Sequence, residues 1–426
     1  MSEKLRVALL GAGTVGSQVA KVLLGQSEGL LSRTGRPLEI VGIAVRNLAK
    51  ERPGIPRELL TNDVGELLSR PKLDIVIELI GGIEPAREFV LAAIAAGASI
   101  ITANKALIAT HGAEIQAAAD AAGVDVYYEA AVAGAIPIIR PLRESLVGDE
   151  ITAVKGIVNG TTNFILEKMT NDGASYEEVL KQAQALGYAE ADPTADVEGF
   201  DAASKAAILA TLAFHTEVTL DDVSREGITG VTSADIAAAK EQGCVIKLLA
   251  RCEVGADGAV LASVHPTMVP LGHPLASIPG AYNAVFIESR YAGRLMFMGP
   301  GAGGSPTASA VLGDVITAAR NRARGVIAPV IPRSPGKILP AGEERSKFYV
   351  SMVVVDRPGV LADVAATFAR HNVSLQAVRQ DPGSEQARLG VVTHPARVVD
   401  MTQALVELER LDAVSPGVSM MRVEGE

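Results

Sequence analysis

Residues 187–205 combine acidic side chains and a lysine in a spacing that suits acid–base chemistry. The segment reads GYAEADPTADVEGFDAASK and holds five carboxylates, one proline and a final lysine. If a helix begins after its second glycine, Asp201 and Lys205 lie four residues apart on one face, where side chains meet. The preceding loop, broken at the proline, can direct Glu190 and Asp196 to the same place. Carboxylates that bind an ammonium group, beside a lysine that moves a proton, indicate an amino-acid substrate. A charged loop that caps an ordinary helix explains this segment equally well.

The whole chain has 426 residues, enough for two or three domains with a sizeable core. Its formal charge of −10 argues against binding to nucleic acid, which needs clustered Lys and Arg. The two cysteines, Cys244 and Cys252, and the scattered histidines lack metal-ligand spacing, and so few cysteines fit a reducing cytoplasm. The sequence shows neither a membrane-spanning apolar stretch nor a signal peptide pattern. We therefore expect a cytoplasmic protein with neither nucleic acid nor a membrane as partner.

A strand, a glycine-rich turn and a helix follow one another near the start of the chain. The apolar run RVALL leads into GAGTVG at residues 11–16, and the helical pattern SQVAKVLL follows. Gly11 permits a tight turn, Gly13 lets a pyrophosphate approach the backbone, and Gly16 lets helix and strand pack closely. The first N–H groups of the helix can bind the phosphates. The pattern predicts a dinucleotide site rather than a glycine-rich turn without function.

Strands alternate with helices as the chain continues. Apolar runs predict strands at residues 6–10, 39–45, 74–80, 99–102 and 125–129, and alanine-rich stretches predict helices at 85–96 and 112–122. Such alternation predicts an α/β fold with a doubly wound parallel sheet of the Rossmann type.

The end of the second predicted strand bears on the choice of cofactor. An NAD site usually has Asp or Glu there, which accepts a hydrogen bond from the ribose 2′-OH. This chain instead reads AVRN at residues 44–47, with Lys50 and Arg52 close behind. Because Arg46 can meet a 2′-phosphate, NADP is favoured, with NAD as the alternative. An ordinary loop charge at Arg46 is the competing interpretation.

Four further segments place polar groups or open backbone where a ligand can bind. Lys105 follows the fourth predicted strand, at the carboxyl edge where ligands of such folds gather. Residues 129–137 (EAAVAGAIP) form a small-residue loop whose oxygens suit a hard cation, although a tight turn explains it as well. Residues 159–163 (NGTTN) form a turn that opens a helix. The second glycine-rich loop, residues 299–307, either brings backbone to a ligand or returns the chain to the first domain.

The final eighty residues have a pattern of their own. Residues 328–346 hold four prolines and two glycines, a composition typical of a linker. The pattern then predicts strand 348–355, helix 360–371, strand 374–379, a turn at 381–383, strand 386–393, helix 396–411 and strand 418–423. This βαββαβ order makes a ferredoxin-like module. Gly359, at the start of its first helix, can free N–H groups for a ligand carboxylate.

Together these motifs resemble the homoserine dehydrogenases of the long, three-part kind. The resemblance covers essentially the whole chain and rests on residues 11–16, 103–105, 129–137, 159–163 and 187–205, the last being close to a family signature. The segment DRPGVL at residues 356–361 resembles the signature of the ACT family. The resemblance implies an NAD(P)-dependent oxidoreductase that interconverts L-aspartate 4-semialdehyde and L-homoserine. Such an enzyme serves threonine, methionine and isoleucine biosynthesis.

The resemblance also implies roles for particular residues. Lys205 and Lys105 match catalytic lysines, without deciding which one donates the proton. Three further sets are implied: for substrate, Gly187, Glu190, Asp196 and Asp201; for cofactor, Gly11, Gly13, Thr14, Val15, Gly16, Arg46, Lys105 and Gly303; and for a monovalent cation (Na+ or K+), Glu129 with the carbonyls of Val132, Gly134 and Ile136.

A three-domain organisation follows from the same resemblance. It comprises a Rossmann NAD(P)-binding domain at residues 1–137, to which the chain returns near 305–327, an α+β catalytic and dimerisation domain at 138–304, a linker at 328–346 and an ACT regulatory domain at 347–426. The implied effector is L-threonine and the implied assembly is a homodimer or homotetramer. An ACT module that serves only dimerisation is the alternative.

Two other functions compete with this interpretation. Aspartate-semialdehyde dehydrogenase shares the substrate and the cofactor, but its chemistry needs a cysteine nucleophile. Cys244 and Cys252 lie far from any predicted loop at the carboxyl edge of the sheet. A regulator that binds NADP and senses an amino acid would have no need of Lys105 and Lys205 together with the carboxylates.

Overall fold

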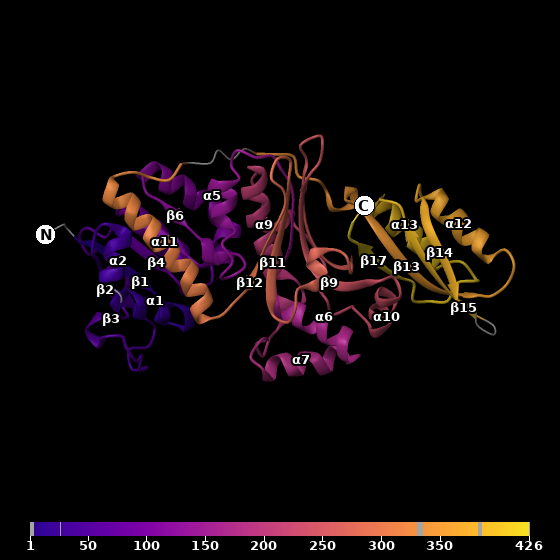
Figure 1. Cartoon of the computed structure of the whole chain (residues 1–426), viewed down its shortest axis with the longest axis horizontal. Helices are drawn as coiled ribbons and strands as arrows, with labels where there is room; N and C mark the ends of the chain where they lie inside the picture. The colour runs from indigo at the N-terminus through magenta and orange to yellow at the C-terminus, as the bar shows by residue number, and fades with distance from the viewer. Residues whose placement is uncertain (1–3, 26, 330–334, 382–385, 426) are drawn as a thin grey trace. The chain divides into compact units, whose positions relative to one another are not determined.

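The computed structural model describes residues 4–25, 27–329, 335–381 and 386–425 (Figure 1). The chain forms two compact units, each assembled from three stretches of sequence. The first unit comprises residues 1–154, 204–221 and 282–336, and the second comprises residues 155–203, 222–281 and 337–426. Among the described residues, no helix is both long and apolar enough to cross a membrane.

A six-stranded parallel sheet lies at the centre of the first unit. Its strand order is β3-β2-β1-β4-β5-β6, and every neighbouring pair is parallel. The strands are β1 (Leu5–Leu10), β2 (Leu38–Ala44), β3 (Leu60–Thr61), β4 (Ile75–Glu78), β5 (Ser99–Thr102) and β6 (Val126–Tyr127). The predicted doubly wound sheet of the Rossmann type is confirmed. The two-residue strand β3 is too short to show a periodic pattern, so the sequence does not predict it.

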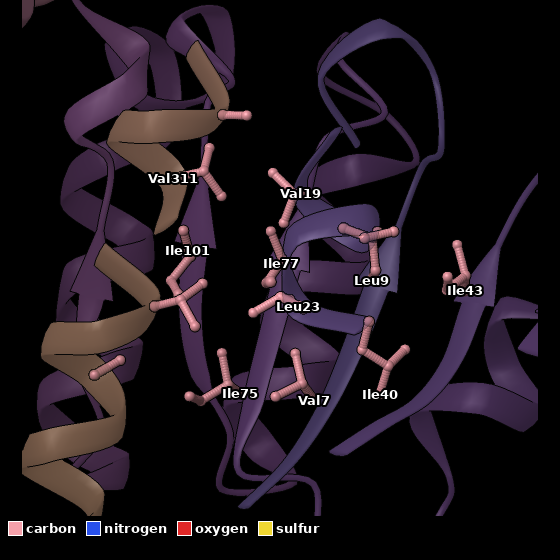
Figure 2. Packing of buried hydrophobic residues seen from close by; sticks show 14 of the residues in the cluster. Val7, Leu9, Val19, Leu23, Ile40, Ile43, Ile75, Ile77, Ile101 and Val311 are labelled. Atoms are coloured by element: carbon pink, nitrogen blue, oxygen red, sulfur yellow. The ribbon is translucent and has the colours of Figure 1, made fainter. Parts of the chain in front are cut away.

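Both faces of this sheet are buried under helices. Alternate side chains of β1, β4 and β5 pack with α1 (Thr14–Gly25) and α11 (Gly304–Arg324), as the close view in Figure 2 shows for Val7, Leu9, Ile75, Ile77, Ile101, Val19, Leu23 and Val311. Because successive side chains of a strand point to opposite faces, the intervening residues lie on the other side, where Ala8, Leu10 and Val76 are also buried. Helices α3 (Val64–Leu68), α4 (Ala86–Ala95) and α5 (Lys105–Ala122) belong to that second layer. Burial on both faces explains why the strands read as continuous apolar runs.

The chain returns to this sheet late in the sequence. Helix α11 packs against α1 and α2 (Ser27–Thr34), and its buried residues belong to the same core cluster as β1. The first unit also holds an antiparallel hairpin of β11 (Tyr282–Ser289) and β12 (Gly293–Pro300). Two elements, β7 (Ile151–Ile157) and α9 (Phe200–Phe214), run across points where the chain passes from one unit to the other.

The second unit combines helices with an antiparallel pair of long strands. Strands β9 (Cys244–Val254) and β10 (Val260–Pro270) pair over their full length, and the short β8 (Ser224–Arg225) joins β10. The helices of this part are α6 (Gly160–Asp172), α7 (Tyr176–Ala185), α8 (Thr194–Val197) and α10 (Ser233–Glu241). Helix α6 packs on β9 and contacts α7, α8 and α10. Asn159 caps α6, as its position in the predicted turn requires.

Residues 345–423 form the predicted βαββαβ module. Its elements are β13 (Arg345–Val355), α12 (Val360–Arg370), β14 (Leu375–Asp381), β15 (Gln386–Thr393), the short β16 (Ala396–Arg397), α13 (Val398–Leu408) and β17 (Ser419–Val423). The strands follow the order β17-β13-β15-β14, and the two helices share one core cluster with β13 and β15. Of the predicted turn at 381–383, residues 382 and 383 lie outside the described residues.

The module is joined to the rest of the second unit by a pair of strands. β17 runs parallel to β10, and the Glu424 N–H donates to the carbonyl of Met268 at 2.8 Å. Lys155 on β7 lies 2.7 Å from the Glu424 carboxylate, and both side chains are largely buried. Within the expected linker, residues 330–334 lie outside the described residues. Beyond them, Lys337 and Leu339 exchange main-chain hydrogen bonds with Val260 of β10.

Candidate functional site

The glycine-rich turn after β1 leaves open space at its middle glycine. Gly11 has φ +100°, and a Cβ atom there would lie 2.7 Å from the Leu79 carbonyl oxygen. A Cβ at Gly16 would lie 2.0 Å from the Gly11 carbonyl oxygen. The fold itself therefore requires these two glycines. A Cβ at Gly13, in contrast, would meet no atom of the described residues within 4 Å. The space at Gly13 is open, and it lies at the amino end of α1, where a pyrophosphate would fit.

The second glycine-rich loop lies beside the first. Gly303 has φ +122° and precedes α11, and a Cβ at Gly304 would lie 3.1 Å from Cγ2 of Thr14. Residues 299–307 return the chain to the first sheet, as one of the two interpretations of this loop predicts. It also brings the Gly303 backbone to the same edge as the glycine-rich turn.

Arg46 is exposed just beyond the end of β2. The neighbouring Arg52 has a contact that the sequence gives no means of predicting. Its Nε donates to the Ala12 carbonyl at 3.3 Å, and its Nη1 donates to the carbonyls of Asn47 and Lys50 at 3.0 and 2.9 Å. Arg52 thus ties the loop that carries Arg46 to the glycine-rich turn. Because 40 residues separate Arg52 from Ala12, no local pattern reveals this link.

Lys105, which follows the fourth predicted strand, is the first residue of helix α5. The Asn104 side chain caps the helix by accepting from the Leu107 N–H at 3.2 Å, and its amide donates to the Gly82 carbonyl at 2.6 Å. The backbone is non-helical at His111, which explains why the pattern predicts a helix only from residue 112. Lys105 is half-buried at the carboxyl end of β5, on the same edge of the sheet as Gly11.

The expected cation loop is buried, but its carboxylate has other partners. Glu129 accepts from the N–H groups of Ile139 and Arg140 at 2.7 and 2.9 Å. Its own N–H donates to Asp314, which pairs with Arg140 at 2.7 Å. Burial raises the pKa of Glu129, and these two backbone donors offset part of the rise. The Glu129 carboxylate therefore fixes the chain at residues 139–140.

The main-chain oxygens of this loop fit a cation better. Ala133 and Gly134 have φ of +55° and +57°, and a Cβ at Gly134 would lie 2.4 Å from the Gly301 carbonyl oxygen. Among the described residues, no hydrogen bond uses the carbonyls of Val132, Gly134 or Ile136, whereas the Ala133 carbonyl accepts from the Ile136 N–H. The described residues contain no cluster of three or more acidic, His or Cys side chains, so a cation here would depend on peptide carbonyls.

Two of the predicted substrate carboxylates are held by one asparagine. The Asn159 amide donates to Asp196 Oδ1 at 2.7 Å and to Asp201 Oδ2 at 2.9 Å. The single hydroxyl hydrogen of Thr161 can reach either the Tyr188 carbonyl, at 2.6 Å, or Asp196 Oδ2, at 3.2 Å. The sequence predicted that Asp196 and Asp201 would face one place, and the structure brings them together. It did not indicate that Asn159 and Thr161 would take part.

The other two substrate candidates lie in the loop before α8. Gly187 has φ +77°, in the left-handed region that favours glycine. Glu190 is exposed, and its main-chain carbonyl accepts from Gln184 Nε2 at 3.1 Å. Among the described residues, no hydrogen bond joins the Glu190 side chain to Asp196 or Asp201.

Lys205 lies one turn after Asp201 on α9, as the spacing predicts. Its side chain is buried, with 8 % of the residue surface exposed, and Asp201 is 7 % exposed. A lysine is almost never buried to this extent without polar partners or a functional reason. The burial of Lys205 beside Asp201 therefore favours a functional role for this lysine.

Three family models match successive parts of the chain. The model for the NAD-binding domain of homoserine dehydrogenase matches residues 11–129, that for homoserine dehydrogenase matches 137–316, and that for the ACT domain matches 348–413. The homoserine dehydrogenase of Corynebacterium glutamicum is 52 % identical over 98 % of this chain and 95 % of its own. The crystal structure of a homoserine dehydrogenase from Thiobacillus denitrificans has a TM-score of 0.93 at 41 % identity, covering 99 % of this chain and 98 % of that one. A hyperthermophilic archaeal homoserine dehydrogenase, solved in complex with NADPH, has a TM-score of 0.64 at 28 % identity, covering 74 % of this chain and 98 % of that one.

The Rossmann-type sheet, the open glycine-rich turn and the match of residues 11–129 to an NAD-binding model define a protein that binds a nicotinamide cofactor. The family follows from the share of the chain that the matches cover, with 52 % identity over 98 % of its length. The chain belongs to the homoserine dehydrogenases, which act on a CH–OH group. The resemblance given by the motifs is thereby confirmed. The family assignment excludes the competing function, that of an aspartate-semialdehyde dehydrogenase. The cysteine nucleophile that such an enzyme needs is also lacking from the exposed surface, because both cysteines are buried in β9.

Proposed function

We propose that this homoserine dehydrogenase interconverts L-homoserine and L-aspartate 4-semialdehyde with NADP, in threonine, methionine and isoleucine biosynthesis. The observation that carries the proposal is the pair Asp196 and Asp201, held together by Asn159, with the buried Lys205 one turn farther along α9. Two carboxylates provide the charge that an amino-acid ammonium group needs. When bound, the nicotinamide supplies the hydride acceptor or donor.

Residues of the chain bind the substrate, transfer the proton and stabilise the developing charge. Asp196, Asp201 and Glu190 bind the ammonium group of the substrate, and the Gly187 backbone borders it. Lys205 removes the hydroxyl proton of homoserine, and it returns a proton to the aldehyde oxygen in the reverse direction. Lys105 adds a second positive charge, which stabilises the negative charge that develops on that oxygen. A Na+ or K+ ion bound by the carbonyls of Val132, Gly134 and Ile136, next to Glu129, has a structural role.

The direct test is a spectrophotometric assay of the purified protein with homoserine and NADP. Formation of reduced cofactor that depends on homoserine supports the proposal. A protein that binds NADP without any turnover would be a sensor instead. Turnover of aspartate 4-semialdehyde that requires inorganic phosphate and oxidises the aldehyde would indicate the competing dehydrogenase.

Arg46→Ala is expected to weaken NADP binding by about ten- to a hundredfold, because a hydrogen bond to a charged group contributes about 1.5–3 kcal/mol. NAD binding should change much less, because NAD lacks the 2′-phosphate. Dissociation constants for both cofactors, measured by fluorescence titration, provide the comparison. Arg57→Ala removes the same charge from another exposed position of the first unit and serves as the control. Equal losses for the two cofactors would show that Arg46 does not select between them.

The ACT module has a cavity at the start of its first helix. The cavity has a volume of about 360 Å³, and residues 354–361 line it together with Gln380 and Leu389. Gln380 donates to Asp356 Oδ1 at 3.1 Å, so the carboxylate is already oriented at the cavity wall. The first N–H groups of α12 can bind a carboxylate, and Asp356 can bind an ammonium group. We infer that this cavity binds L-threonine, which lowers the activity.

Asp356→Asn is expected to raise the inhibition constant for threonine by about ten- to a hundredfold, because the charge opposite the effector ammonium is lost. Steady-state rates across a threonine titration give the constant. Asp412→Asn, an exposed position of the same module, is the matched control. Unchanged inhibition in Asp356→Asn would place the effector elsewhere, and no inhibition of the wild type would leave the module an assembly element.

The outer strand of the β11–β12 hairpin supports an oligomer. Along β12, Met296 and Met298 are 42 % and 53 % exposed, and Tyr291 in the connecting turn is 74 % exposed. Apolar side chains on an edge strand are a surface that a second copy would cover. We propose that the protein is cytoplasmic and forms a homodimer or homotetramer. Light scattering would measure the molar mass of the assembly.

A further inference from the structure

The orientation of the Asn159 amide is fixed by the helix that it caps. Its Oδ1 accepts from the Thr162 N–H at 2.9 Å and from Thr162 Oγ1 at 3.0 Å. The Nδ2 group must therefore face the opposite way, where its two hydrogens meet two different carboxylates. The distances are 2.7 Å to Asp196 and 2.9 Å to Asp201.

An amide is the side chain that suits this position. Asn159 is 5 % exposed, so water cannot readily replace its donors. Two carboxylates close together repel each other, and each then favours the protonated form. The two hydrogens of the Asn159 amide, one directed at each carboxylate, offset part of this repulsion. An aspartate at position 159 would still cap α6, but it would present acceptors to two acceptors.

The turn that carries Asn159 is anchored at a second point. Asn163, four residues on, is 1 % exposed and donates to the carbonyls of Ile278 and Gly280 at 3.2 and 2.7 Å. Its Oδ1 accepts from Lys247 Nζ at 2.8 Å, and Lys247 also donates to the Ile278 carbonyl at 2.8 Å. Burial lowers the pKa of Lys247 to about 8, so this ammonium group is held inside the fold against a desolvation cost.

We propose that Asn159 is a positioning residue that holds Asp196 and Asp201 in place for the substrate ammonium group, and that Lys247 and Asn163 fix the helix turn from which it acts. The inference rests on the substrate-binding role proposed above for the two carboxylates. Asn159 itself does not have to touch the substrate.

Asn159→Asp in the full-length protein is the first test. The variant keeps the helix cap and the side-chain volume, but it places a third carboxylate against two others at a buried position, so its melting temperature should fall. Its KM for homoserine should rise by about tenfold or more, since two charge-assisted hydrogen bonds are lost. Its KM for NADP should stay within about twofold, because the cofactor turn lies elsewhere in the sequence. A disturbed fold would raise both constants together.

Asn159→Ser covers the case in which the aspartate variant does not fold. Serine is a good helix cap but is too short to reach both carboxylates. Lys247→Met should raise the KM for homoserine in the same direction by a smaller factor, with a lower melting temperature. An unchanged KM for homoserine in the Asn159 variants, or an equal rise for homoserine and NADP, overturns the inference.

Asp196→Asn and Asp201→Asn separate this inference from the proposed function. If neither raises the KM for homoserine, the substrate role of the carboxylates is wrong. If both raise it while Asn159→Asp does not, the carboxylates bind substrate and only the positioning role fails. The double variant Asn159→Asp with Asp196→Asn should cost less than the product of the single effects, because the two residues act through one contact. Independent, multiplicative effects would contradict the proposal.

Discussion

Replacing Lys205 by alanine is expected to lower kcat for homoserine oxidation by about a hundred- to ten-thousand-fold, the usual contribution of a general acid or base. The dissociation constant for NADP should stay close to that of the wild type, because the proposed role is in proton transfer. Steady-state kinetics and a fluorescence titration of the cofactor measure the two quantities.

Two controls separate chemistry from packing. Lys205 is buried, so alanine also leaves a cavity, whereas Lys205→Met fills most of that volume without the charge. Both variants should lose activity to a similar extent. Lys240→Ala, on an exposed face of α10, removes a positive charge from the surface and should leave kcat unchanged. A Lys205 variant with nearly wild-type kcat would exclude this residue as the proton-transfer group.

Gly13→Val is expected to weaken the binding of NADP by about a hundredfold or more while the protein stays folded. The added Cβ would lie in the open space next to the turn, with no other atom of the described residues within 4 Å, and the side chain would keep the phosphates from the backbone. Loss of two hydrogen bonds to charged groups, at about 1.5–3 kcal/mol each, accounts for a factor of that size. Calorimetric titration with NADP and a thermal melt are the measurements.

Two other glycines provide the comparison for this variant. A Cβ at Gly16 would lie 2.0 Å from the Gly11 carbonyl, so Gly16→Ala should lower the melting temperature as well as cofactor binding. A Cβ at Gly148 meets nothing within 4 Å among the described residues, and Gly148→Val should leave both unchanged. If Gly13→Val binds NADP as tightly as the wild type, the phosphates do not approach this turn.

The predictable parts of the fold were those specified by local sequence. Five of the six strands of the first sheet were predicted within a few residues because burial on both faces makes them uniformly apolar. The βαββαβ module was predicted because its helices and strands alternate with clear periods. The start of α5 was placed too late because the backbone bends at His111 and the cap at Asn104 was overlooked.

The parts that escaped prediction depend on contacts between distant residues. The acidic segment indicated that Asp196 and Asp201 would act together, since they lie close in sequence. Asn159 comes from a separate helix start 37 residues before Asp196, so its contacts could not be inferred from spacing. The same holds for Arg52 and Ala12, and for the N–H groups of Ile139 and Arg140 that donate to Glu129.

The pairing of β17 with β10 bears on how the ACT module and its proposed effector site should be separated from the rest of the enzyme. Cutting the chain after Gly336 would remove the ACT module, but it would also take from β10 a neighbouring strand and leave an open edge prone to aggregation. The same cut would take Glu424 from the largely buried Lys155 and Glu344 from Arg251. Both cations keep Glu253 as a partner, so the cut weakens the charge compensation of two largely buried ions without removing it. Point substitutions in the loop at residues 356–361 leave this junction intact and are the better way to remove the proposed effector site.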